Sequence, residues 1–164
     1  MDLADRFAAS HGQPVEVEGR TVHALYLREL SPGQTFTVSL FSKPRPGLVQ
    51  GLRIKVTRGT LTVARTNTAD IVLWADTAPR TVELRYGGPK NRDLKVWNCW
   101  RDQDQVMQAW IGNAGMVVEE RGMGRVVLRC NIGPALSFDD LRAELDFAQA
   151  KAAMGPDSQT ADSR

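Results

Sequence analysis

The sequence contains four tryptophans, and these are the side chains with the clearest capacity to bind a ligand. Trp74, Trp97, Trp100 and Trp110 all lie within a stretch of 37 residues. If the segment that begins at Val96 is extended, its alternation places Trp97 on one face and Trp100 on the other. A strand in a two-sheet sandwich turns only one face to the core. At least one of these rings must therefore face outward or be covered by another segment.

Polar residues close to these rings complete a candidate binding site. We predict that Trp97, Asn98, Arg101, Gln108 and Trp110 form a ligand-binding surface. An indole face next to amide and guanidinium groups suits a sugar ring or another polar small molecule, and it also suits a protein partner. The alternative is a purely structural role, in which the opposing sheet and the terminal segments cover both faces of the strand.

The histidines and carboxylates give only weak signals for catalysis. His11 and His23 are the two histidines, and no G-x-S-x-G motif accompanies them, so a serine hydrolase is not indicated. The neighbouring carboxylates are Asp102 and Asp104, Glu119 and Glu120, and Asp139 and Asp140. We therefore favour a non-catalytic protein. The alternative is an enzyme acting on a polar substrate, which would have to bring carboxylates together from separate strands.

The sequence predicts neither a metal site nor a cofactor. Cys99 and Cys130 are the two cysteines, and they lack the Cys-x-x-Cys or Cys/His spacing of a zinc site. The glycine-containing segments 112–115 and 122–124 lie between predicted strands and not ahead of a helix, so they do not predict a phosphate-binding loop. Because both cysteines lie in strand-like segments, we expect them to be unpaired and buried.

Positive charge is concentrated in the middle of the chain. Residues 43–101 hold twelve Lys and Arg against four acidic residues, whereas the whole chain has a net charge of only +2. A further alternative function is therefore a polyanion-binding domain that uses Arg53, Lys55 and Arg85. The basic residues form no dense run, so we do not expect a nucleic-acid partner.

The elements that must position these residues follow from an alternation of apolar and polar side chains. The alternation extends from residue 14 to about residue 132, with turn residues roughly every ten positions, which is typical of an antiparallel β-sandwich. We predict an all-β domain over residues 14–147, an antiparallel β-sandwich of jelly-roll type with about ten strands. Residues 1–13 form an N-terminal segment with a short helix capped by Gly12. Residues 148–164 form a C-terminal tail, a short helix and then a flexible end.

The tryptophan-bearing region is predicted to be a meander. Four consecutive antiparallel strands are expected at residues 94–100, 106–112, 116–120 and 125–132. The connecting turns at 112–115 and 122–124 predict positive φ at Gly115 and Gly124. In the second of these strands the alternation assigns Met107, Ala109 and Ile111 to the core.

The segment 137–147 can be interpreted in two ways. Ser137 and Asp140 resemble a helix-capping box. The apolar residues that follow, however, alternate strictly with charged ones: Leu141, Ala143, Leu145 and Phe147. A helix would turn Phe147 to solvent, whereas a strand buries all four side chains, so we favour a strand.

These observations give an expected function. The alternating strands and the tryptophan-bearing meander are similar in outline to jelly-roll carbohydrate-binding modules, a likeness of fold that transfers no residue roles. We expect a non-catalytic binding or interaction protein, with a carbohydrate as the first ligand to test. The N-terminal sequence lacks the apolar stretch of a secretory signal, and no apolar run approaches the ~18 residues of a membrane helix. We therefore expect a cytoplasmic protein without a membrane partner. The sequence does not indicate its oligomeric state.

Overall fold

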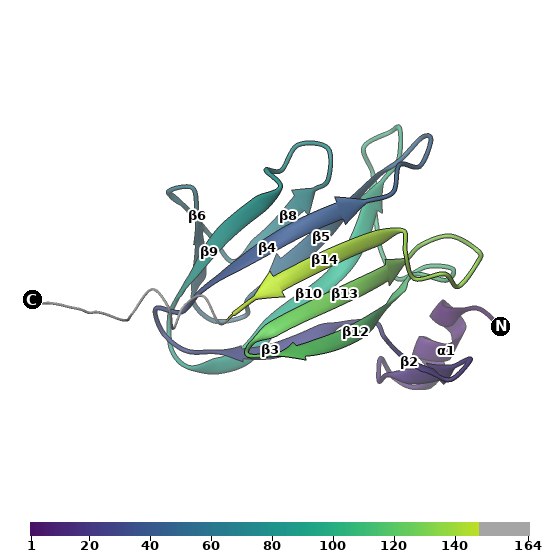
Figure 1. Cartoon of the computed structure of the whole chain (residues 1–164), viewed down its shortest axis with the longest axis horizontal. Coiled ribbons are helices and arrows are strands. Elements are labelled where there is room, and N and C mark those ends of the chain that lie inside the picture. The colour runs from purple at the N-terminus through teal and green to yellow at the C-terminus, as the bar shows by residue number, and fades with distance from the viewer. Residues whose placement is uncertain (148–164) are drawn as a thin grey trace, which may run out of the picture.

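The alternation of apolar and polar side chains produces two antiparallel sheets that pack face to face (Figure 1). The computed structural model describes residues 1–147, except for the side chains of residues 91–93. The predicted all-β sandwich is confirmed, whereas the jelly-roll topology stays a prediction. The short helix and flexible end predicted for residues 148–164 lie outside the described residues.

One sheet has nine strands. In spatial order they are β1 (Val15–Val17), β2 (Arg20–His23), β12 (Gly115–Gly122), β13 (Arg125–Asn131), β14 (Leu141–Asp146), β4 (Thr35–Ser42), β9 (Thr81–Gly87), β6 (Thr60–Val63) and β7 (Thr66–Thr68). The β14 strand confirms the strand interpretation of residues 137–147. Its register with β4 and β13 turns Leu141, Ala143 and Leu145 into the core, and Phe147 is buried directly after it.

The second sheet has five strands and lies behind the first in Figure 1. Its strands are β11 (Met107–Gln108), β10 (Asn91–Arg101), β5 (Val49–Lys55), β8 (Asp70–Trp74) and β3 (Tyr26–Leu30), which pairs with β10. The main core fills the space between the two sheets. Inward residues of β10 and β5, such as Val96 and its cross-strand partner Ile54, face Phe36, Val38 and other buried side chains of the nine-stranded sheet.

The predicted four-stranded meander is wrong, because the chain changes sheets in its middle. The strands β10 and β11 pair with each other in the five-stranded sheet, while β12 and β13 pair in the nine-stranded sheet. Residues 109–114 cross between the sheets. The second strand stops after two residues, and Trp110 has a φ of 59°, which ends the alternation. As a result Met107 and Ile111, which were predicted to be core residues, are exposed.

The predicted N-terminal helix is present as α1 (Leu3–Ala9). Asp2 caps its start through a capping box with Asp5. The predicted cap at Gly12 is wrong, because Ser10 is the C-cap. Gly12 lies two residues after this cap, and its N–H donates to the Phe7 carbonyl.

Crossing residues fix the position of α1 at the end of the sandwich. The Asn113 side-chain oxygen accepts from the Leu3 N–H at 3.0 Å, and the Gly112 carbonyl accepts from the Ala4 N–H at 2.9 Å. The apolar face of α1 then joins a second, smaller core whose buried members are Leu3, Phe7, Val17, Val22 and Phe138.

Gly115 is needed for space and not for backbone conformation. Gly124 has the predicted positive φ, at 80°, but Gly115 does not, so that part of the prediction is wrong. A Cβ at Gly115 would lie 2.9 Å from a methyl carbon of Val22 and 3.1 Å from a methyl carbon of Leu3. The absence of a side chain at this position therefore lets α1 and β2 approach β12 closely.

We expect Gly115→Ala to destabilise the fold by about 1–3 kcal/mol, because the added methyl overfills a packed site. Gly87→Ala is the matched control. Gly87 also lies in a strand without positive φ, and its added Cβ would have a single neighbour within 4 Å, the Thr60 hydroxyl at 3.9 Å. Urea denaturation of both variants tests the difference. Equal stability of the two variants would contradict the packing argument.

Candidate binding surface around Trp110

Trp97 lies on the face of the five-stranded sheet that points away from the other sheet. Its neighbour Asn98 faces inward, so the alternation of β10 turns Trp97 outward. The ring is nonetheless only 5% exposed, because Trp110 stacks on it with 4.9 Å between ring centroids and an interplanar angle of 26°. Among the described residues the buried Trp97 indole N–H has no hydrogen-bond partner. Packing therefore holds this ring in place.

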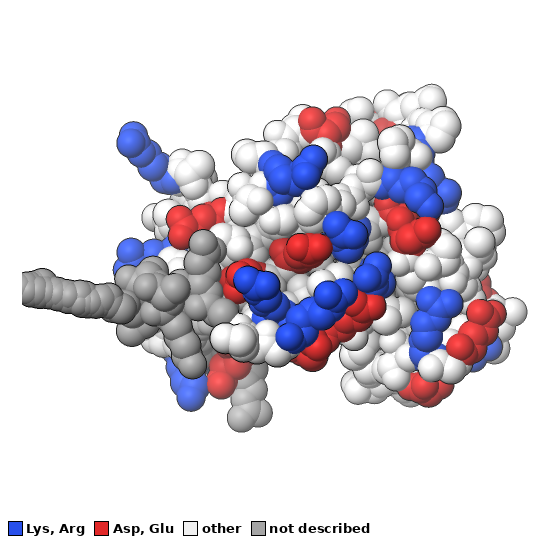
Figure 2. Space-filling view, in the orientation of Figure 1, with Lys and Arg blue, Asp and Glu red and all other residues white. Residues whose placement is uncertain are grey.

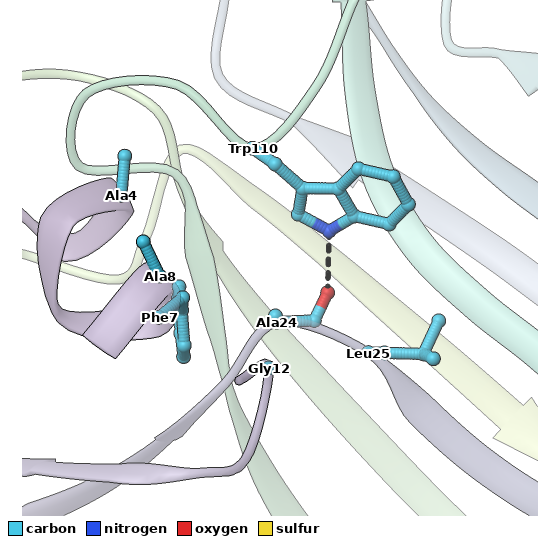
Figure 3. A pocket seen from close by; sticks show the side chains of 7 residues that line it. All are labelled: Ala4, Phe7, Ala8, Gly12, Ala24, Leu25 and Trp110. Atoms are coloured by element: carbon cyan, nitrogen blue, oxygen red, sulfur yellow. Dashed lines mark hydrogen bonds between the residues drawn. The ribbon is translucent and has the colours of Figure 1, made fainter. Parts of the chain in front are cut away.

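Trp110 is half exposed and firmly anchored. Its side chain is 44% accessible, although its indole N–H donates to the Ala24 carbonyl at 2.8 Å (Figure 3). A positive φ at a bulky residue costs of order 1–3 kcal/mol and is concentrated at functional sites. Stacking below and the hydrogen bond at the indole edge hold the outer face of the ring in one orientation. The result is a pre-organised aromatic surface.

An apolar groove lies beside this ring. Trp110 forms one wall, and Figure 3 shows Ala4, Phe7 and Ala8 of α1 across from it, with Gly12, Ala24 and Leu25 along the floor. Its volume is about 350 Å³. The small side chains of α1 keep it open: Ala4 and Ala8 lie one helical turn apart on the same face. Both walls depend on residues 109–114, which carry Trp110 and bind α1.

Most of the exposed large apolar side chains come from segments that adjoin the groove residues in the chain. Of the seven among the described residues, five come from β3 and from residues 106–111: Leu27, Val106, Met107, Trp110 and Ile111. Leu27 is 57% exposed and follows Leu25, which lines the groove. We refer to these five residues and the groove as the Trp110 surface. Exposed apolar side chains grouped in this way mark interaction sites more often than isolated ones do.

The five residues predicted to form the ligand-binding surface do not all lie on one surface. Asn98 is buried between the sheets, where its amide donates to the Asn131 carbonyl at 3.2 Å. Trp97 lies under Trp110. The Gln108 amide donates to the Asp102 carboxylate at 3.2 Å. The placement of Asn98 on the binding surface is therefore corrected: it is a core residue. Whether the other four contact a ligand stays a prediction.

Arg101 belongs to a second aromatic group on the same sheet face. Its guanidinium lies 4.6 Å from the ring centroid of Trp74 and bonds both carboxylate oxygens of Asp76, at 2.9 and 3.0 Å. Trp74 in turn lies flat on β5, where a Cβ at Gly51 would come within 2.6 Å of the indole. One terminal nitrogen of Arg101 is thus already bonded within the protein, and its Nε is buried without a hydrogen-bond partner among the described residues.

The remaining charges on this face are arranged by strand register. Arg53 is directly opposite Trp97, lies 5.3 Å from its ring centroid and bonds Asp70 twice, at 2.6 and 2.9 Å. The hydrogen bonds from Arg53 lower the pKa of Asp70. Lys55 and Lys95 are directly opposite each other, and neither is within ion-pair distance of a described carboxylate. Asp70 is directly opposite Lys55 on the other side, and the positive charge of Lys55 contributes to the lowered pKa of Asp70. This part of the face is consequently basic.

The three residues of the polyanion hypothesis do not share a surface. Arg53 and Lys55 are on the outer face of the five-stranded sheet, whereas exposed Arg85 on β9 lies on the outer face of the nine-stranded sheet. On that second face basic and acidic side chains alternate (Figure 2). Many of them form ion pairs, such as Arg129 with Glu119 and Arg142 with Glu144. These contacts leave no extended basic surface there.

Most of the neighbouring carboxylates have structural partners. Asp102 accepts from the backbone N–H of Asp104 and of Val106, as expected for a hairpin turn. A second cleft, of about 330 Å³, contains Asp139 and Asp140. Hydrogen bonds from Ser137 and Lys43 lower the pKa of Asp139, the opposite of what a general acid requires. The Asp140 carboxylate accepts from the backbone N–H groups of Ile132 and Gly133.

No metal-binding cluster of three or more His, Cys, Asp or Glu side chains occurs among the described side chains, those of residues 1–90 and 94–147. Burial lowers the pKa of His23, which lies in β2 of the nine-stranded sheet. In the described part of the chain no helix has the length and apolar character to cross a membrane.

Comparison with protein-family models and with curated proteins finds no match to this chain. Inference about function therefore starts from the geometry of the Trp110 surface. Sequence reasoning singled out Trp110 but missed the groove, because Ala4, Ala8 and Ala24 carry no chemical signal of their own. The one available sign was the pair of alanines at helical spacing on the predicted N-terminal helix.

Both cysteines are free and buried, as predicted. Burial raises the pKa of the Cys99 thiol to about 12 and also raises the pKa of Cys130. Because the thiolate is the reactive form, we expect neither thiol to react with a disulfide reagent in the native protein near neutral pH. Both should react once the protein is unfolded in concentrated guanidinium chloride. Rapid labelling of the native protein would contradict this placement.

The same pKa shift predicts a loss of stability in alkali. An unfolded thiol ionises near pH 8.5, whereas folded Cys99 stays protonated up to about 12. The contribution of the Cys99 thiol to the free energy of unfolding is therefore fully present below the pKa of the unfolded thiol. It is lost as the pH rises toward the pKa of the folded thiol, by up to about 1.4 kcal/mol per pH unit. The free energy of unfolding, measured by urea denaturation at several pH values in this range, should fall less steeply with pH for Cys99→Ala than for the unmodified chain.

Proposed function

We propose that this protein is a non-catalytic binding protein and that the Trp110 surface is its recognition site. The observation that carries the proposal is the combination of exposure and anchoring at Trp110. A large ring left half in water forgoes part of the ~2–3 kcal/mol that its burial would contribute. The same ring is held by stacking on Trp97, by a hydrogen bond to Ala24 and by a left-handed backbone. These costs are understandable if the ring is used for binding.

The geometry supports binding better than catalysis. Four of the six carboxylates that the sequence singled out are engaged by backbone amides or by cationic side chains: Asp102, Glu119, Asp139 and Asp140. The Trp110 groove is lined by apolar side chains and contains no titratable group. A pocket without an acid, a base or a nucleophile can bind a ligand but offers no group to transform it.

Two arrays test this proposal, one of immobilised glycans and one of immobilised peptides about ten residues long. We expect the protein to bind members of at least one array, and Trp110→Ala to weaken that binding by about tenfold or more, as for an interface hot spot. Met123→Ala is the matched control. Met123 is 88% exposed and lies on the β12–β13 turn, away from the Trp110 surface.

Circular dichroism and the melting temperature must show that both variants fold. Trp110→Ala uncovers Trp97, so some loss of stability is expected, and binding is therefore measured well below the midpoint of unfolding. Binding that survives Trp110→Ala, or that Met123→Ala weakens equally, would place the recognition site elsewhere. Absence of any binding on both arrays would count against the proposal.

A further inference from the structure

We propose that the Trp110 surface binds an acidic peptide segment that has one large apolar anchor residue. This inference rests on the proposed function and names its partner class. The anchor enters the groove between α1 and Trp110, and the flanking carboxylates contact Lys55 and Lys95. Three features of the surface support this assignment over a sugar.

The first feature is the character of the groove. All of its lining side chains are apolar, and its two sides are an indole and the alanine face of a helix (Figure 3). At about 350 Å³ it has room for one aliphatic or aromatic side chain. The exposed residues around it, Leu27 and Ile111 among them, extend the apolar contact beyond a single ring. A surface of this kind suits a buried anchor surrounded by weaker contacts.

The second feature is that the polar atoms near the ring are either already bonded or, like the Trp97 indole N–H, buried out of reach of a ligand. The Trp110 N–H donates to Ala24, the Gln108 amide to Asp102, and Arg53 to Asp70. A sugar ring brings several hydroxyl groups that lose hydrogen bonds to water on binding and need new partners. The surface offers few such partners without breaking internal bonds. An apolar side chain needs none.

The third feature is the basic character of the adjoining strands. Lys95 is two residues from Trp97 on the same face of β10, which places it about 7 Å away along the strand. Two residues are directly opposite Lys95 on the neighbouring strands: Lys55 on β5 and Leu27 on β3. Like charges at directly opposite positions destabilise a sheet. Asp70, directly opposite Lys55 on β8 and bonded by Arg53, offsets part of this repulsion. Arg53, Lys55 and Lys95 against Asp70 still leave a net charge of +2 on this face, so its charge is complementary to an acidic segment.

The probe is an array of synthetic peptides of about ten residues, each with one Leu, Ile, Met, Phe or Trp flanked by Asp and Glu. Matched peptides have the same anchor flanked by Lys, or Ala in place of the anchor. We expect acidic peptides with an anchor to bind, and both matched sets to bind about tenfold more weakly or not at all. Affinity for the best peptide, measured by fluorescence polarisation, should fall as salt increases.

Two pairs of variants of the full chain locate the contacts. Ala8→Trp fills the groove and should weaken peptide binding by about tenfold or more, whereas Ala9→Trp, on an exposed neighbouring position of α1 outside the groove, should leave it unchanged. Lys55→Glu and Lys95→Glu should each weaken binding by about threefold or more. Arg65→Glu makes the same change of charge at an exposed turn between β6 and β7 and should have little effect.

The possible outcomes separate this inference from the proposed function. Preference for Lys-flanked peptides, or binding that Ala8→Trp and the two lysine variants leave unchanged, would overturn the acidic-peptide assignment. Glycan binding that depends on Trp110, or concentration-dependent self-association abolished by Ala8→Trp, would also overturn it while leaving the Trp110 surface as the recognition site. Absence of Trp110-dependent binding to peptides, glycans and a second copy would overturn both.

Discussion

The need to cover Trp97 is the constraint on which this end of the molecule depends. Its indole occupies the face of β10 that a two-layer sandwich leaves in water. Trp110 covers it, at the cost of a left-handed backbone of about 1–3 kcal/mol. Ring stacking contributes about 0.5–1.5 kcal/mol beyond the buried area, and the hydrogen bond to Ala24 adds roughly 1 kcal/mol. These gains are of the same order as the backbone strain, so the burial of Trp97 decides the balance in favour of the observed arrangement.

The change of sheet follows from this arrangement. Once Trp110 has turned outward, residues 111–114 must carry the chain over the edge of the sandwich to β12. On the way the Asn113 side-chain amide donates to the Pro134 carbonyl and its oxygen accepts from the Leu3 N–H. The crossing segment therefore positions α1, and Gly115 leaves room for it. The groove beside Trp110 exists because one segment supplies both the ring and the attachment of the helix.

The sequence predicts those parts of the structure in which one periodicity continues without interruption. Strand β14 is an example, since four alternating apolar residues outweighed a local capping signal, and α1 is another. The meander failed at Trp110, because alternation gives no sign of where a strand leaves its sheet. Alternation also grouped Asn98 correctly with Val96 but could not say that this face is the inner one, since both faces of β10 carry a tryptophan. The groove was beyond prediction, because it requires the tertiary contact of α1 with residues 111–113.

The stability of the unbound surface and its selectivity have the same physical origin. The Trp110 indole and the Gln108 amide are hydrogen-bonded internally, so the surface is fixed before a partner arrives and little conformational entropy is lost on binding. For the same reason those side chains cannot provide specific hydrogen bonds to a ligand. Selectivity must then come from the shape of the groove and from Lys55 and Lys95, neither of which is within ion-pair distance of a described carboxylate. Asp70, directly opposite Lys55 on β8, offsets only part of the positive charge that Arg53, Lys55 and Lys95 bring to this face. Under the proposed binding mode a carboxylate of the partner beside Lys95 would offset the rest, so a charge that is unfavourable in the free protein would become favourable in the complex.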